Sequence, residues 1–187
     1  MKKIVIFASG SGTNAENIIK HFANHETISV VQVLTNNRYA KVLERCKVLE
    51  MSAFCFNSIA YYKTGHVKSH LLDLKPDLIV LAGFLWKFPK DILDEFPNKV
   101  INIHPALLPK YGGKGMYGKH VHEAVINNLE KESGITIHYV NENYDEGNII
   151  FQAKCEVDEM DTPELLANKI HELEMEHYPK QIEELLT

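Results

Sequence analysis

An unbroken apolar run at residues 77–83, with the sequence DLIVLAG, is the feature that most limits how this chain can fold. A strand-length segment without alternating polar residues is typical of a strand buried on both faces. Similar runs alternate along the chain with segments of helical period, which predicts an α/β fold with an open, Rossmann-like, mostly parallel sheet and helices on both faces. The predicted parallel strands are residues 2–8, 28–35, 53–57, 77–83 and 99–104, and the predicted helices are residues 14–24, 39–50, 61–74 and 89–96.

The order of elements changes in the last third of the chain. Residues 134–140 and 148–157 read as two strands joined by a short polar loop, which predicts an antiparallel C-terminal addition to the sheet. Thr162 and Pro163 suit the cap and first position of a final helix, with Pro179 as a candidate kink. No repeat or linker interrupts this order, so we expect a single domain over residues 1–187.

Composition restricts the kind of partner. A chain of 187 residues with 45% hydrophobic content is long enough for one substantial core. Its formal charge of -5 argues against binding a nucleic acid, because such proteins usually carry a basic face. Three widely spaced cysteines, Cys46, Cys55 and Cys155, fit reduced thiols in the cytoplasm better than a disulfide framework. We expect them to pack as small hydrophobic residues of the core.

The N-terminal sequence does not predict a targeting segment. The apolar run after Lys2 and Lys3 ends at once in Ser9 and Gly10, so it is too short for a signal peptide. No later apolar stretch approaches the length that spans a bilayer. We therefore expect a soluble, cytoplasmic protein with no membrane partner.

The first candidate binding motif is the turn SGSGTN, residues 9–14, between a predicted strand and a predicted helix. A glycine-rich turn before a helix lets backbone amides approach an anion such as a phosphate. The turn lacks the endings of the P-loop and of the dinucleotide fingerprint, and no acidic ribose ligand follows the second strand. An ordinary tight turn with Thr13 capping the helix is the alternative.

The second motif places an amide beside an imidazole. Asn102 and His104 are two residues apart in a predicted strand, so they project from one face near its carboxyl end. Two convergent donors of this kind stabilise an oxyanion, and Asp145, in the loop 141–148, is a carboxylate that would keep the imidazole charged. A hydrogen-bonded polar pair that merely closes the strand is the alternative. With no nucleophilic Ser or Cys beside a base, these residues indicate acyl transfer to an acceptor that brings its own nucleophile.

Other histidines give weaker signals. His66 and His70 have helical spacing for a metal, but no acidic third ligand accompanies them, and we expect no metal site. His120 and His122 are two apart at the start of a presumed helix, so they face different ways and are expected at the surface or in a loop.

The motifs together resemble a known family along nearly the whole chain. The turn at 9–14, LAGFLWKF at 81–88, NIHPALLPKYGG at 102–113, HYVNENYDEGNIIFQ at 138–152, and Glu174 with HYP at 177–179 are similar to the folate-dependent formyltransferases. The block Asn-x-His-Pro-x-Leu-Leu-Pro with a downstream Asp is specific to them. The glycine turn and the Glu174 segment favour the phosphoribosylglycinamide formyltransferase branch, which formylates the amine of glycinamide ribonucleotide for purine biosynthesis.

The resemblance implies a role for each matching residue. Asn102, His104 and Asp145 would be catalytic, with 10-formyltetrahydrofolate as co-substrate and formyl donor. The N-terminal half would bind the ribonucleotide phosphate, and the C-terminal half would bind folate and carry the catalysis. The implied ribonucleotide ligands are Gly12, Thr13, Asn14, Pro105 and Glu174. The implied folate-binding residues are Leu85, Trp86, Lys87, Phe88, Asn102, Asn141, Tyr144 and Asp145. The resemblance also implies a cis bond before Pro109.

The sequence departs from the family pattern in several places. Trp86 and Lys87 replace a Met-Arg-type pair, Ala106 replaces a common Ser, and residues 110–119 form a longer, glycine-rich loop. Alternative acceptors within the family are a transfer RNA, a sugar nucleotide and water, but those enzymes usually carry additional domains. A binding module that kept the anion site without catalysis is the non-enzymatic alternative. We expect a monomer or a homodimer.

Overall fold

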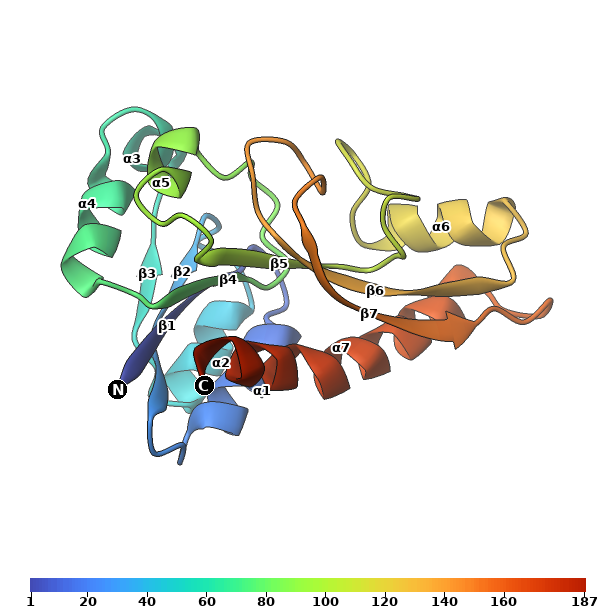
Figure 1. The fold of residues 1–187 in the computed structure, drawn as a ribbon, viewed down its shortest axis with the longest axis horizontal. Coiled ribbons are helices and arrows are strands. Elements are labelled where there is room, and N and C mark those ends of the chain that lie inside the picture. The colour runs from blue at the N-terminus through green and yellow to red at the C-terminus, as the bar shows by residue number, and fades with distance from the viewer.

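The computed structural model describes residues 1–187 as one seven-stranded sheet in the order β3-β2-β1-β4-β5-β6-β7 (Figure 1). The strands are β1 (Lys2–Phe7), β2 (Ile28–Thr35), β3 (Ala53–Cys55), β4 (Leu78–Leu81), β5 (Val100–His104), β6 (Glu132–Tyr139) and β7 (Ile149–Glu156). The helices are α1 (Thr13–Phe22), α2 (Val42–Val48), α3 (Ser58–Tyr62), α4 (His66–Leu74), α5 (Lys90–Leu93), α6 (Lys119–Asn127) and α7 (Pro163–Leu186).

The first five strands are parallel, as predicted. The chain runs outward from β1 through β2 to β3 and then returns to place β4 on the other side of β1. The loops that follow β1 and β4 therefore leave the same edge of the sheet in opposite directions. In open α/β sheets this reversal opens a crevice at the carboxyl ends of the strands.

The antiparallel addition is also confirmed. β6 pairs with β5 and β7 pairs with β6, both antiparallel. The β5–β6 register sets Asn102 opposite His138 and His104 opposite Thr136. This register decides which side chains of β6 lie beside the motif of β5.

The core is divided by the sheet into two layers. Ile4 and Ile6 of β1 belong to one buried cluster, and Val5 and Phe7 belong to the other, because successive side chains of a strand point to opposite faces. The first cluster includes residues of α1, α2 and α7, and the second includes residues of α3, α4 and α5. Figure 1 shows α7 lying beside α1 along one side of the sheet, with α3, α4 and α5 grouped at the other side.

Local differences from the predicted elements have local causes. The helix predicted over residues 61–74 is two helices, α3 and α4, because Gly65 adopts the left-handed conformation with φ 69°. The expectation that all three cysteines are buried is wrong for Cys55, which is exposed on the edge strand β3, and Cys155 is only half-buried. Cys46 is buried as expected. None of the helices has both the length and the apolar character needed to cross a membrane.

The last helix is fastened to the centre of the sheet. α7 continues through Pro179 to Leu186, and the Thr162 side chain caps it by accepting a hydrogen bond from the Leu165 N–H. Tyr178 is fully buried, and its hydroxyl donates a hydrogen bond to the Leu81 carbonyl at 3.0 Å. Burial raises the pKa of Tyr178 well above its ordinary value, so the hydroxyl stays protonated and remains a donor.

We predict that Tyr178→Phe lowers the free energy of unfolding by about 1–2 kcal/mol, because the variant keeps the ring but leaves the buried Leu81 carbonyl without its donor. Urea unfolding followed by circular dichroism measures the change. Tyr39→Phe is the matched control, since Tyr39 is 81% exposed and its free energy of unfolding should not change. Equal stability of Tyr178→Phe and the unsubstituted protein would contradict the role of this hydrogen bond.

Candidate active site

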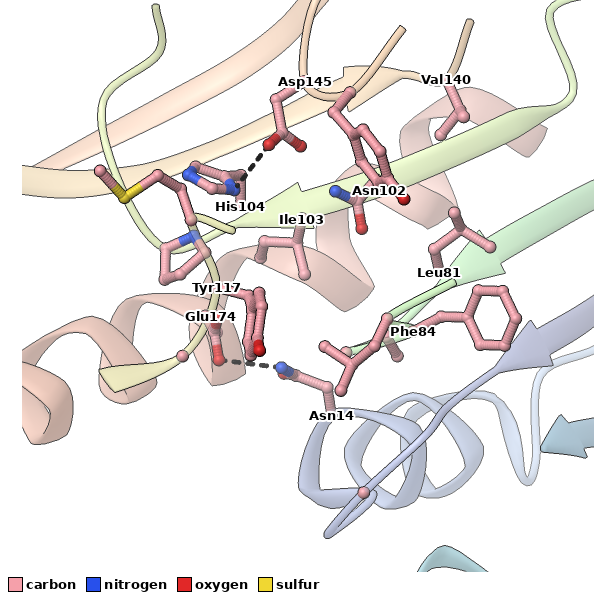
Figure 2. Close-up of a pocket in the computed structure, with 18 of the residues that line it drawn as sticks. Asn14, Leu81, Phe84, Asn102, Ile103, His104, Tyr117, Val140, Asp145 and Glu174 are labelled. Carbon is pink, nitrogen blue, oxygen red and sulfur yellow. Dashed lines mark hydrogen bonds and ion pairs between the residues drawn. The ribbon is translucent and has the colours of Figure 1, made fainter. Parts of the chain in front are cut away.

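A cavity of about 780 Å³ lies at the carboxyl ends of β1, β4 and β5 (Figure 2). Its walls come from the turn after β1, the segment after β4, the end of β5, the loop after β6 and the middle of α7. The structure brings every residue that the sequence singled out for catalysis or binding to this cavity. These residues are Gly12, Thr13, Asn14, Leu85, Trp86, Lys87, Phe88, Asn102, His104, Pro105, Asn141, Tyr144, Asp145 and Glu174.

The glycine turn leaves the start of α1 uncapped. Gly12 is left-handed with φ 74°, and a Cβ there would lie 2.5 Å from the Val42 side chain, so only glycine fits. Gly12 itself occupies the cap position and no side chain caps the helix, so the alternative of a tight turn with Thr13 as the cap is not what the structure shows. The first amides of α1 therefore keep their hydrogen-bonding capacity for a ligand at this end of the cavity.

Asn14 and Glu174 connect α1 to α7 across the cavity floor. The Asn14 Nδ2 donates to Glu174 Oε2 at 2.9 Å (Figure 2). The Asn14 Oδ1 is buried and has no partner within the chain. His171 Nδ1 lies 3.5 Å from the same Glu174 oxygen, and this contact raises the pKa of His171. The pair presents a carboxylate and a free amide oxygen, both suited to accept hydrogen bonds from hydroxyl groups.

The amide of Asn102 is oriented by His138, a residue that the sequence analysis missed. The His138 Nδ1 lies 2.9 Å from the Tyr139 carbonyl, so this nitrogen carries a proton and donates it. In the neutral ring the other nitrogen, Nε2, then accepts from Asn102 Nδ2 at 3.2 Å. One N–H of the amide is thereby engaged with His138, and the second remains available to a ligand.

His104 is fixed by two contacts in a buried position. It is only 3% exposed, its Nε2 donates to the Tyr111 carbonyl at 2.8 Å, and its Nδ1 lies 3.6 Å from Asp145 Oδ2 (Figure 2). Burial lowers the pKa of His104, and the nearby Asp145 carboxylate offsets this only in part. The expectation that Asp145 keeps His104 protonated is therefore wrong for the free protein near neutral pH, because the cost of burying the charge is larger than the gain from the carboxylate.

Asp145 remains ionised in the same surroundings. Its side chain is 11% exposed, and burial alone would raise its pKa. Contacts to His138 and His104 and a 2.9 Å hydrogen bond from the Gly113 N–H outweigh burial and hold the pKa below the ordinary value. The free site thus pairs a carboxylate with a neutral imidazole that is ready to accept a proton.

The loop after β5 is held from behind by the antiparallel strands. The Thr136 hydroxyl donates to the Ala106 carbonyl at 2.7 Å and accepts from the Leu108 N–H at 3.0 Å. The Gln152 side-chain amide donates to the Leu108 carbonyl at 3.1 Å and to the Thr136 hydroxyl at 2.8 Å. The peptide bond between Leu108 and Pro109 is cis, as the resemblance implied.

The other end of the cavity has an aromatic wall after β4. The Trp86 ring lies 5.8 Å from that of Tyr62 and 6.1 Å from that of Phe56, and the Tyr62 hydroxyl donates to the Lys87 carbonyl at 2.9 Å. Phe88 is buried against Phe7. Leu85 is 52% exposed at the cavity edge. Trp86 and Phe88 therefore also stabilise this wall by packing.

His122 and part of the glycine-rich loop were not anticipated as cavity residues. His122 was expected at the surface or in a loop, but it is 6% exposed on α6 and lines the cavity, whereas His120 is exposed as expected. Residues 113–118 of the glycine-rich loop also line the cavity. No signal in a single sequence gives the rotation of α6 about its axis, but the strand pattern and a β5–β6 register would have identified His138.

Comparison with known proteins agrees with this geometry. Residues 2–182 match the family described as "Formyl transferase". The chain is 35% identical to the phosphoribosylglycinamide formyltransferase of Bacillus subtilis (strain 168), over 100% of this chain and 95% of that protein.

Solved structures give the same result. The crystal structure of glycinamide ribonucleotide transformylase 1 from Geobacillus kaustophilus superposes with a TM-score of 0.90 at 31% identity, covering 100% of both chains. That of phosphoribosylglycinamide formyltransferase from Bacillus halodurans gives 0.88 at 36% identity, over 100% of this chain and 96% of that one. A chain that carries this sequence pattern, this fold and this cavity belongs to the formyl transferase family.

Proposed function

We propose that this protein transfers the formyl group of 10-formyltetrahydrofolate to the amine of glycinamide ribonucleotide, a reaction of purine biosynthesis. The observation that carries the proposal is the convergence of Asn102, His104 and Asp145 at the middle of one cavity whose far end is an uncapped helix start. Family membership supports the chemistry, and the names of the relatives support the acceptor.

The two substrates enter opposite ends of the cavity in this proposal. The amides of Gly12, Thr13 and Asn14 bind the ribonucleotide phosphate, Glu174 accepts hydrogen bonds from the ribose, and Pro105 packs beside the acceptor. Folate lies against Leu85, Trp86, Lys87 and Phe88 after β4 and against Asn141 and Tyr144 after β6. The N-terminal half thus binds mainly the acceptor, and the C-terminal half supplies folate contacts and catalysis.

The chemistry needs no nucleophile from the protein. The acceptor amine attacks the formyl carbon, and a new C–N bond forms as the carbonyl oxygen gains negative charge. The free N–H of Asn102 and His104, which takes up the proton lost by the amine, stabilise this oxyanion. The bond to N10 of the folate then breaks, and Asp145 assists the transfer of the proton lost by the amine to N10, which leaves tetrahydrofolate.

The charge state of His104 is linked to the reaction. His104 is neutral in the free site, and the developing oxyanion adds a negative charge to that of Asp145 beside the ring. A nearby negative charge favours the imidazolium, so His104 binds a proton most tightly when the oxyanion exists. The stabilisation is therefore greater in the transition state than in the ground state.

Location and assembly are further parts of the proposal. Cys46, Cys55 and Cys155 are free thiols, which supports a reducing compartment such as the cytoplasm. The partners proposed are the two small-molecule substrates, with no nucleic acid and no membrane, and the protein acts as a monomer or a homodimer. Transfer to a sugar nucleotide or to water uses the same residues and is the alternative.

The test is a formyl-transfer assay with purified protein and 10-formyltetrahydrofolate, with glycinamide ribonucleotide present or omitted, followed by folate absorbance. Release of tetrahydrofolate only in the presence of the ribonucleotide is the expected result. Release without it would mean hydrolysis, and no release in either case would refute the proposed acceptor.

We predict that His104→Ala lowers kcat by about two to three orders of magnitude, because the oxyanion loses a donor. Asp145→Asn is expected to lower kcat by about 100-fold or more, because the imidazolium loses its electrostatic support. Steady-state assays with both substrates saturating measure the effects. His66→Ala is the control, since His66 is exposed at the start of α4, away from the cavity. Near-normal kcat in His104→Ala would refute the assigned mechanism.

Binding at the phosphate end gives a separate prediction. Asn14→Ala is expected to raise the KM for glycinamide ribonucleotide by about tenfold, while the KM for 10-formyltetrahydrofolate changes little, because a hydrogen-bonding side chain is lost only at the ribonucleotide end. Asn17→Ala is the matched control. Asn17 is on the same helix and donates to the Met175 carbonyl at 2.7 Å, but it does not line the cavity. Equal rises in both KM values for Asn14→Ala would place the ribonucleotide elsewhere.

A further inference from the structure

His122 is a buried histidine of the cavity wall to which the proposed reaction gives no role. It lies in the first turn of α6, is 6% exposed and lines the cavity. His120, two residues earlier, has a 52% exposed side chain beside Glu123 and does not line the cavity. The two histidines of one helix end therefore have different surroundings.

The imidazole of His122 has no polar partner in the free protein. Its Nδ1 is buried and makes no hydrogen bond. Buried polar atoms are hydrogen-bonded in the great majority of cases, and leaving one unpaired costs about 1–3 kcal/mol. The neighbouring Val121 and Val125 are fully buried apolar residues that give the ring no compensation. A partner supplied by a ligand in the cavity would remove this cost.

The charged neighbours of His122 locate it within the cavity. Burial lowers its pKa, the Glu174 carboxylate opposes this shift, and His104 reinforces it. His122 is therefore within electrostatic reach of both the proposed ribose ligand and the proposed catalytic imidazole. No group of three metal-ligating side chains surrounds it, so the unpaired nitrogen is not explained by a metal cluster.

The stretch of acceptor that would lie between Glu174 and His104 has a defined chemistry. In glycinamide ribonucleotide, an amide N–H and C=O join the ribose to the methylene that carries the attacking amine. A neutral imidazole has one donor nitrogen and one acceptor nitrogen, so it can either accept from the amide N–H or donate to the amide C=O. None of the residues to which the proposed function gives a role contacts this amide.

We propose that His122 is an acceptor-binding residue, whose imidazole hydrogen-bonds the amide between the ribose and the attacking amine of the ribonucleotide. The inference rests on the proposed function, because it assigns a contact within that acceptor. It also gives the site a means to distinguish an aminoacylated ribosylamine from a plain sugar phosphate. Binding of the amide would hold the amine at a fixed distance from the formyl carbon.

The test compares two probes on three variants. Isothermal titration calorimetry measures the Kd of glycinamide ribonucleotide and of ribose 5-phosphate, which lacks the amide, for His122→Leu, His122→Gln and the control His120→Leu. His122→Leu is expected to raise the Kd of glycinamide ribonucleotide about tenfold and to change the Kd of ribose 5-phosphate less than about twofold. His122→Gln should recover part of the affinity, because a carboxamide also donates and accepts. His120→Leu should bind both probes normally.

Several outcomes would overturn the inference. Unchanged affinity of His122→Leu for glycinamide ribonucleotide would show that His122 makes no contact with the acceptor. Equal losses for the two probes would place the contact on the ribose or reflect a structural defect. Thermal unfolding checks the fold, and His122→Phe takes the place of His122→Leu if the latter does not fold.

The formyl-transfer assay separates this inference from the proposed function. If the unsubstituted protein shows no ribonucleotide-dependent transfer, the proposed function fails and the inference fails with it. If the unsubstituted protein is active and His122→Leu has an unchanged KM for glycinamide ribonucleotide, the inference alone fails. The KM for 10-formyltetrahydrofolate should stay within about twofold in every His122 variant, because the contact is confined to the acceptor.

Discussion

The antiparallel pairing of β5 with β6 is the constraint on which the site depends. Parallel strands alone would bring Asn102 and His104 to the crevice, but the pairing sets His138 directly opposite Asn102 and orients its amide. The same register brings Thr136 beside the loop that follows His104. The hairpin then leads back to Asp145, which meets both histidines. A slip of one residue would turn each of these side chains to the other face.

Asp145 and His104 together carry a different charge in the free site from the one that the proposed transition state requires. Asp145 is ionised, while the buried His104 is neutral, so the cavity holds a carboxylate without a compensating imidazolium. Burying a full ion pair would add a desolvation cost in every resting molecule. A neutral ring that gains its proton as charge develops avoids this cost in the ground state. The backbone N–H of Gly113 helps to keep the carboxylate ionised in the meantime.

The sequence predicted the succession of strands and helices along the chain and the antiparallel addition, because these depend on local periodicity. The residues expected at the cavity came from short, specific motifs that resemble a known family. It missed His138 and His122, since one requires the register between two strands and the other requires the rotation of α6 about its axis. The break at Gly65 was missed because apolar periodicity continues across it. The charge of His104 was misjudged because a sequence shows a nearby carboxylate but not the depth of burial.

The hydrogen bonds behind the catalytic loop bear on how this sequence can vary. Thr136 is fully buried and Gln152 lies on the outer strand, and neither lines the large cavity, yet together they hold the carbonyls of Ala106 and Leu108 and the Leu108 N–H. A side chain that cannot both donate and accept at position 136 would leave at least one of these groups unpaired. The set of residues that shapes the catalytic loop therefore extends along one face of the sheet, from β5 across β6 to β7. Tolerance to substitution at these two positions should follow that of the cavity wall and not that of an ordinary strand.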